Sequence, residues 1–95
     1  MAEYQITYWR NIPSMIIVKA GDETLKGILP ARFQEAIDEA AMRLGETDSD
    51  SYLAGWNKGQ WITAEGELAH ISENLVASLE SEFTQEKLQE ILDNL

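Results

Sequence analysis

The fold is decided by residues 4–18, which read YQITYWRNIPSMIIV. The first six of these residues alternate with a period of two and are rich in aromatic and β-branched types, which is typical of a half-buried strand. Residues Arg10–Pro13 interrupt the alternation, because proline has no amide hydrogen to donate to a β-ladder. The apolar run Met15–Val18 then predicts a second strand that is covered on both faces. The connection is too short for a parallel crossover, so the two strands are expected to be antiparallel.

The segments that follow predict one more strand and then several helices. Residues Ala20–Glu23 are a turn signal, and Thr24–Leu29 predict a weaker third strand. Pro30 fits the first position of a helix, and apolar side chains then recur at helical spacing from Phe33 to Leu44. Gly45 is expected to end this first helix. Further helices are expected around Tyr52–Trp56, along Leu68–Phe83 and after Thr84, which is a plausible N-cap. A brief extended piece is expected at Trp61 and Ile62. The sequence therefore predicts an α+β fold, with a small antiparallel three-stranded sheet packed by about four helices in one domain over residues 1–95.

Composition and charge exclude several classes of function. The 95 residues include no cysteine, which excludes disulfides, thiolate chemistry and cysteine-ligated metal centres. The net charge is −10, from 17 acidic and 7 basic residues, and Lys87 is the single base within residues 59–95. Such a surface repels a phosphate backbone, so we expect no nucleic-acid binding. The acidity favours either a solvated surface or a docking face for a basic partner.

The sequence contains no predicted membrane span or targeting signal. The longest apolar run, Met15–Val18, is far shorter than the roughly 20 residues that a transmembrane helix needs. Residues 1–5 lack the basic stretch and the apolar stretch of a secretory signal. We therefore expect no membrane association and a cytoplasmic location.

Residues suited to catalysis or metal binding are few. His70 is the only histidine, and it flanks an apolar helical stripe, where a solvated or edge-of-core side chain is expected. Glu46–Asp50 has acids at alternate positions, as at the start of a calcium loop, but Ser51 and Asn57 stand where that loop requires glycine and glutamate. This segment is interpreted as a helix-capping linker. The sequence has no phosphate-binding, dinucleotide-binding or nucleophile-elbow motif, so we expect no catalytic residue, metal or cofactor.

Two groups of aromatic residues are candidates for binding. Trp9 stands next to Arg10 at a strand end, and both residue types are favoured at interaction hot spots. The other interpretation is that Trp9 covers the sheet while Arg10 pairs with a local acid. Tyr52, Trp56 and Trp61 lie within ten residues and would form either a recognition patch or a cap on the core. The sequence leaves both alternatives open.

The same residues carry a family resemblance. The segments concerned are Tyr8–Pro13, Leu29–Phe33, Ala36–Met42 and Tyr52–Trp56. Together they resemble the domain family named for conserved virulence factor C, over nearly the whole chain. One position departs from the family pattern, because Met15 stands where a glutamine is common.

The resemblance implies an accessory role. In the larger relatives this domain lies between a NifU-like scaffold N-terminal domain and HEAT-type repeats, which implies a role in protein assembly with a link to iron–sulfur or cofactor metabolism. The family name describes a phenotype and implies no catalytic residues. Without cysteine, this chain would act by docking on a separate protein.

The leading hypothesis is a non-catalytic accessory domain that binds a protein partner. Its candidate contact residues are Trp9, Arg10, Asp38, Met42, Tyr52 and Trp56. The alternative is a site for a small anionic metabolite, or an enzyme of unrecorded type. In that alternative Arg10 and Arg32 hold the anion, and Asp38 or Tyr52 transfers a proton. A homodimer that buries the aromatic patch is a third possibility.

Overall fold

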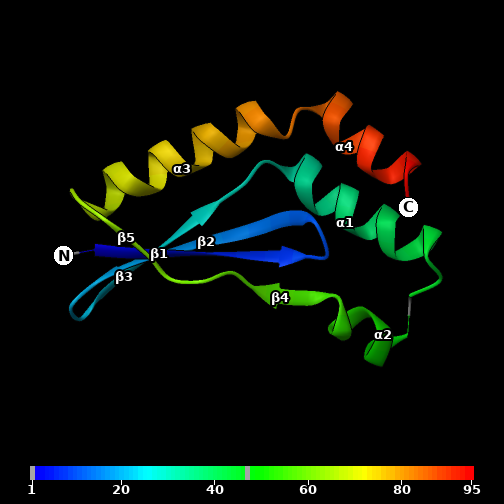
Figure 1. Cartoon of the computed structure of the whole chain (residues 1–95), viewed down its shortest axis with the longest axis horizontal. Helices are drawn as coiled ribbons and strands as arrows, with labels where there is room; N and C mark the ends of the chain where they lie inside the picture. The colour runs from blue at the N-terminus through cyan, green and yellow to red at the C-terminus, as the bar shows by residue number, and fades with distance from the viewer. Residues whose placement is uncertain (1, 47) are drawn as a thin grey trace.

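The computed structural model describes residues 2–46 and 48–95, and an antiparallel sheet runs along its length (Figure 1). The elements follow in the order β1 (Ala2–Trp9), β2 (Ile12–Ala20), β3 (Glu23–Ile28), α1 (Ala31–Arg43), α2 (Ser49–Ala54), β4 (Trp56–Lys58), β5 (Ile62–Ala64), α3 (Leu68–Glu82) and α4 (Gln85–Asp93). The α+β class predicted from the sequence is confirmed.

The sheet has five strands, which corrects the predicted count of three. Its order is β3-β2-β1-β4, and β5 also pairs with β1. The first three strands form the predicted antiparallel meander. Strands β4 and β5 have three residues each and pair with opposite ends of β1. A three-residue strand is too short to show an alternating pattern, so only the pairing with β1 defines it.

The β1–β2 connection contains two local irregularities that shape one end of the sheet. Arg10 has φ 53°, a left-handed conformation that is uncommon for a residue other than glycine. The register shifts after the pair Thr7 and Met15, because Tyr8 pairs with Pro13 and Ser14 has no partner on β1. A bulge of this kind bends a strand and increases its twist.

Helix α1 ends where the sequence predicts, but it begins at Ala31, one residue after the predicted first position Pro30. Pro30 is its N-cap and Leu44 its C-cap, and Gly45 follows with φ 71°, as expected for a C′ glycine. The cap predicted at Thr84 is also confirmed, because its side chain accepts a hydrogen bond from the Lys87 amide at 3.2 Å.

The helix expected around Tyr52–Trp56 is shorter than predicted. Helix α2 ends at Ala54, and Trp56 belongs to strand β4. Its N-cap is Asp48, whose carboxylate accepts a hydrogen bond from the Ser51 amide at 3.2 Å. Trp56 is extended rather than helical because it pairs with Trp9 on β1.

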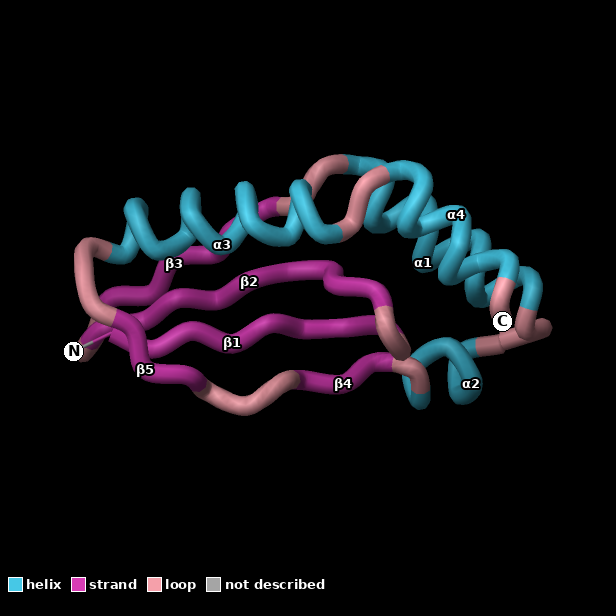
Figure 2. The backbone as a smooth tube through the Cα atoms, turned by 45° about the horizontal axis from the view of Figure 1, so that its top comes forward, coloured by secondary structure: helices cyan, strands magenta, loops and turns pink. Residues whose placement is uncertain are grey.

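The helices cover only one face of the sheet. Helices α1 and α3 pack on that face, α4 packs on α1, and α2 lies at one end beside β4 (Figure 2). Strand β2 is therefore not covered on both sides, which corrects the prediction. Ile16 and Val18 are fully buried under the helices, whereas Met15 and Ile17 are half-buried on the other face. Within the described part of the chain, no helix is long and apolar enough to cross a membrane.

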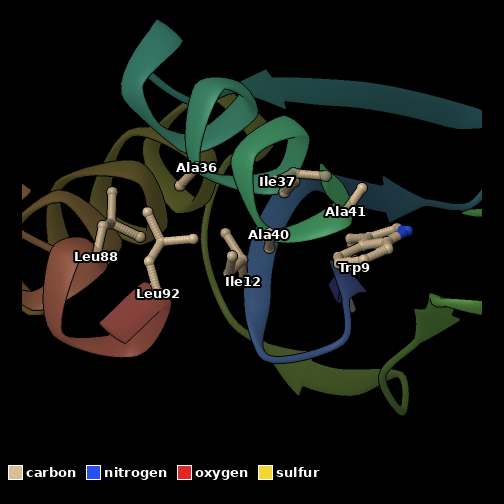
Figure 3. Packing of buried hydrophobic residues seen from close by; sticks show 8 residues of the cluster. All are labelled: Trp9, Ile12, Ala36, Ile37, Ala40, Ala41, Leu88 and Leu92. Atoms are coloured by element: carbon tan, nitrogen blue, oxygen red, sulfur yellow. The ribbon is translucent and has the colours of Figure 1, made fainter. Parts of the chain in front are cut away.

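Two hydrophobic clusters hold the helices to the sheet. One joins the end of the sheet to α1 and α4, and its residues are Trp9, Ile12, Ala36, Ile37, Ala40, Ala41, Leu88 and Leu92 (Figure 3). The other joins the sheet to α3 and the start of α1, and it includes Ile16, Val18, Phe33, Ile71 and Leu79. Full burial of a large apolar side chain contributes roughly 1.5–3 kcal/mol, so the first cluster fixes the end of the sheet where the candidate residues lie.

Candidate functional site

Three aromatic rings meet at the end of the sheet, where β1, α2 and β4 converge. The Trp9 ring stacks on Tyr52 with centroids 5.8 Å apart, and Tyr52 meets Trp56 edge to face at 5.9 Å. Trp9 is 0% exposed and its Nε1–H donates to the Tyr52 carbonyl oxygen at 2.8 Å. Tyr52 and Trp56 are half-buried. Trp9 therefore supports this site from the core, and the other two rings reach its surface.

Close packing at Gly55 brings the three rings together. A Cβ atom at this position would lie only 2.5 Å from Cε2 and Nε1 of Trp9. The Gly55 carbonyl also accepts the backbone N–H of Arg10 at 2.8 Å. These contacts attach the α2–β4 junction to the β1–β2 turn, and they determine where Tyr52 and Trp56 stand.

The Arg10 side chain is exposed but already has a partner. Its guanidinium forms a two-point interaction with the Glu46 carboxylate, with Nε donating to Oε2 at 3.0 Å and Nη2 donating to Oε1. Its Cζ also lies 5.5 Å from the Trp9 ring centroid. Pairing with a local acid was one of the two interpretations of this residue, and the structure shows that pairing.

Asp38 and Met42 lie apart from this cluster, on the outer side of α1. Both are exposed, and Met42 is 61% exposed. The Asp38 carboxylate accepts a hydrogen bond from Nε2 of Gln34 at 3.0 Å. Of the six candidate residues, the structure thus gathers Trp9, Arg10, Tyr52 and Trp56.

A groove of about 550 Å³ opens beside the aromatic cluster. Its lining comes from the β1–β2 turn, the α2–β4 junction and the C-terminal parts of α1 and α4; the residues are Trp9, Arg10, Asn11, Ile12, Ala40, Leu44, Ala54, Gly55, Asn57, Ile91 and Leu95. The sequence did not identify Leu44, Ile91 or Leu95 as site residues. Their apolar periodicity predicts a helix face, and only the packing of α4 on α1 turns that face into a groove wall.

Comparison with protein-family models matches the virulence factor family over residues 7–92. The chain belongs to the virulence factor family. The match extends from β1 to α4, so the resemblance found on the sequence is confirmed. Searches of curated proteins and of solved structures give no match.

This virulence factor domain does not assemble the residues proposed for an anion site. Arg10 pairs with Glu46 beyond the C-terminal end of α1, whereas Arg32 is in the first turn of that helix. A helix of 13 residues spans roughly 20 Å, which is too far for both guanidiniums to hold one small anion. Arg32 instead donates to the carbonyls of Glu80 at 3.0 Å and Phe83 at 3.2 Å, so it binds α1 to the end of α3.

Arg43 connects the two helices that form the groove wall. Its Nε donates to Glu39 at 3.0 Å, and its Nη1 donates to the Leu92 carbonyl and to the Asp93 carboxylate, each at 3.1 Å. Hydrogen bonds from Gln89 and from Arg43 hold the pKa of Asp93 below its usual range. Asp93 is therefore favoured as a carboxylate in the folded domain.

The residues examined for metal binding are dispersed in the virulence factor domain. Over residues 2–46 and 48–95, no three histidine or acidic side chains gather in a way that could hold a metal ion. His70 is exposed on α3. In the segment Glu46–Asp50, Glu46 binds Arg10 and Asp48 caps α2, while Thr47 lies outside the described residues.

Proposed function

We propose that this member of the virulence factor family is a non-catalytic accessory domain that binds a protein partner at the groove beside Tyr52 and Trp56. The observation that carries the proposal is the chemistry of the groove lining. Its side chains are mostly apolar, and none of them is an acid, a hydroxyl or an imidazole. A reaction would need such groups, whereas a partner chain can bind a surface that combines apolar side chains with the amide groups of Asn11 and Asn57.

Three polar groups that line the groove support binding rather than chemistry, because they are engaged within the domain. Arg10 is held by Glu46, and Trp9 Nε1 donates to Tyr52. Asn57 Nδ2 donates to the Gly55 carbonyl at 3.3 Å. Leu44 is 37% exposed on the groove wall, and its burial by a partner would remove apolar surface from water. Tyr52 and Trp56 would extend the contact, since aromatic residues dominate interface energetics.

The proposal is tested by affinity capture from native lysate with wild-type and variant domains. Leu44→Glu introduces a charge on the groove wall, and Ile62→Glu is the matched control because Ile62 is also an exposed aliphatic residue but lies on β5 at the other end of the sheet. We expect Leu44→Glu to lose a defined partner that wild type and Ile62→Glu both retain. Circular dichroism should show that all three proteins are folded. Retention of the same partners by Leu44→Glu would contradict the groove as the docking site.

A further inference from the structure

The sheet has a second face, opposite α1 and α3, that the helices leave uncovered (Figure 2). Strand register identifies the residues on it. Gly27 faces α3, because a Cβ there would meet Ser72 and Val76, so its neighbours Lys26 and Ile28 point to the other side. We call the surface formed by Met15, Ile17, Lys19, Lys26, Ile28 and Lys58 the open face.

The pairing of the strands confirms that these side chains share one side of the sheet. Ile28 is opposite Met15, Met15 is opposite Thr7, and Thr7 is opposite Lys58. Directly paired residues of antiparallel strands project to the same side. In the same way Lys26 is opposite Ile17, and Lys19 is opposite Glu3 on β1.

The open face is positively charged in a strongly acidic chain. Three of the four lysines of the sequence lie on it, although the net charge is −10. Lys19 lies 4.0 Å from Glu3 and also contacts the Trp61 ring, with Nζ 4.1 Å from the ring centroid. For Lys26 and Lys58, no carboxylate among the described residues lies within salt-bridge distance.

The arginines are used differently. Arg10, Arg32 and Arg43 each bind groups of this domain, either a carboxylate or backbone carbonyls at helix ends. The cations that hold the fold together are thus separate from the cations on the open face. Lys26 and Lys58, which have no such partner among the described residues, are available to an external partner.

The open face is also apolar between its lysines. Ile28 is 87% exposed, the most exposed of the large apolar side chains among residues 2–46 and 48–95, and Met15 and Ile17 are half-buried. A depression of about 410 Å³ lies beside Met15, between it and Trp56 and Lys58. A surface of this composition fits a ligand that brings both apolar side chains and negative charge.

We propose that the open face binds an acidic amphipathic helix of a partner protein. A sheet face is normally covered by helices or by a second sheet, and here one face already has helices. The apolar stripe of the partner helix would lie over Met15, Ile17 and Ile28. Its carboxylates would meet Lys58 on β4, which lies to one side of these apolar residues, and Lys26 on β3, which lies opposite Ile17 and on the same strand as Ile28.

Charge also distinguishes this occupant from two others. Two copies of the domain that paired through their open faces would bring lysines against lysines, which is unfavourable. A nucleic acid would gain only three lysines while it approached a chain of net charge −10. An acidic helix meets the same net charge, but it gains the apolar contacts with Met15, Ile17 and Ile28 as well as the lysines, and a phosphate backbone does not. The inference rests on the lysines and apolar residues of the open face, none of which lines the groove, although Trp56 stands beside the groove and also borders the depression on the open face.

The test measures binding of designed helical peptides by fluorescence anisotropy. One labelled peptide carries a leucine stripe flanked by glutamates, and its counterpart carries lysine at every glutamate position. We expect the glutamate peptide to bind, the lysine peptide not to bind, and the affinity to fall when salt rises from about 50 to about 300 mM. Equal binding of both peptides, or no saturable binding of the glutamate peptide up to about 1 mM, would overturn the proposal.

Two protein variants locate the binding surface. Lys26→Glu on β3 and Lys87→Glu on α4 change the net charge equally, and both positions are exposed. Lys26→Glu should weaken the glutamate peptide by about fivefold or more, whereas Lys87→Glu should stay within about twofold of wild type. Equal losses in both variants would mean that overall charge, not the open face, determines binding. A wild-type dimer in light scattering that Lys26→Glu converts to a monomer would assign this face to a second copy of the chain and refute the partner helix.

Discussion

Replacement of Gly55 by alanine tests how the candidate site is held in place. The backbone at Gly55 is ordinary, with φ −75° and ψ −21°, so alanine adds no backbone strain. The cost comes from the side chain, because the new Cβ would lie 2.5 Å from two atoms of the Trp9 ring and 2.9 Å from a third. The ring cannot move away easily, since it is 0% exposed and bonded to the Tyr52 carbonyl.

The expected loss of stability is at the upper end for an overpacked core. Extra atoms in a well-packed interior typically cost 1–3 kcal/mol, and we expect about 2–3 kcal/mol for Gly55→Ala because the obstacle is a rigid, buried ring. In a domain of this size the midpoint of thermal unfolding should fall by roughly 10–20 °C. The displaced junction also carries Tyr52 and Trp56, so partner capture at the groove should weaken as well.

Urea unfolding of a double-mutant cycle with Trp9→Phe provides the assay. Phenylalanine lacks the indole atoms nearest to Gly55, so Gly55→Ala should cost at least about 1 kcal/mol less in the Trp9→Phe background than in wild type. Gly21→Ala is the control: Gly21 has φ 58° but open space around it, so its cost of about 1 kcal/mol should be the same in both backgrounds. A cost below about 0.5 kcal/mol for Gly55→Ala, or equal costs with and without the indole, would refute the packing argument.

Two further changes have expected outcomes. Thr7→Val should stabilise the domain by about 1 kcal/mol in urea unfolding. Thr7 Oγ1 is buried with no hydrogen-bond partner among the described residues, and valine keeps the shape of the side chain without the hydroxyl. A loss of stability would mean that the hydroxyl has a partner. Asp93→Asn should lower the thermal midpoint near neutral pH, and the difference from wild type should shrink as the solution is acidified. The folded pKa of Asp93 is lowered, so its contribution to stability is present above its unfolded value of about 3.9 and is lost as the pH falls through the folded value. A difference that persisted unchanged at low pH would contradict this role for the Asp93 carboxylate.

Four of the six candidate residues could be grouped from the sequence because they belong to short, recognisable segments. Trp9 and Arg10 end the first alternating strand, and Tyr52 and Trp56 lie in one aromatic segment. Their meeting depends on the pairing of β4 with β1, which joins residues more than 40 positions apart. Asp38 and Met42 are residue types that can contact a partner, but they lie on the exposed side of α1, away from the aromatic cluster. The opposite side of α1 carries its buried residues, which include Phe33, Ile37 and Ala41.

The sequence by itself determined the elements whose signals are local. Pro30 and Gly45 bracket α1, Thr84 caps α4, and alternation with a proline break defines β1 and β2, because each of these preferences acts within a few residues of chain. Only the tertiary structure decided the rest. The pairing of β4 and β5 with β1, the groove wall of α1 and α4, and the uncovered lysine face all depend on which distant segments pack together. The packing of distant segments is the arrangement that minimises the free energy of the whole core, so it cannot be predicted from any short window of sequence.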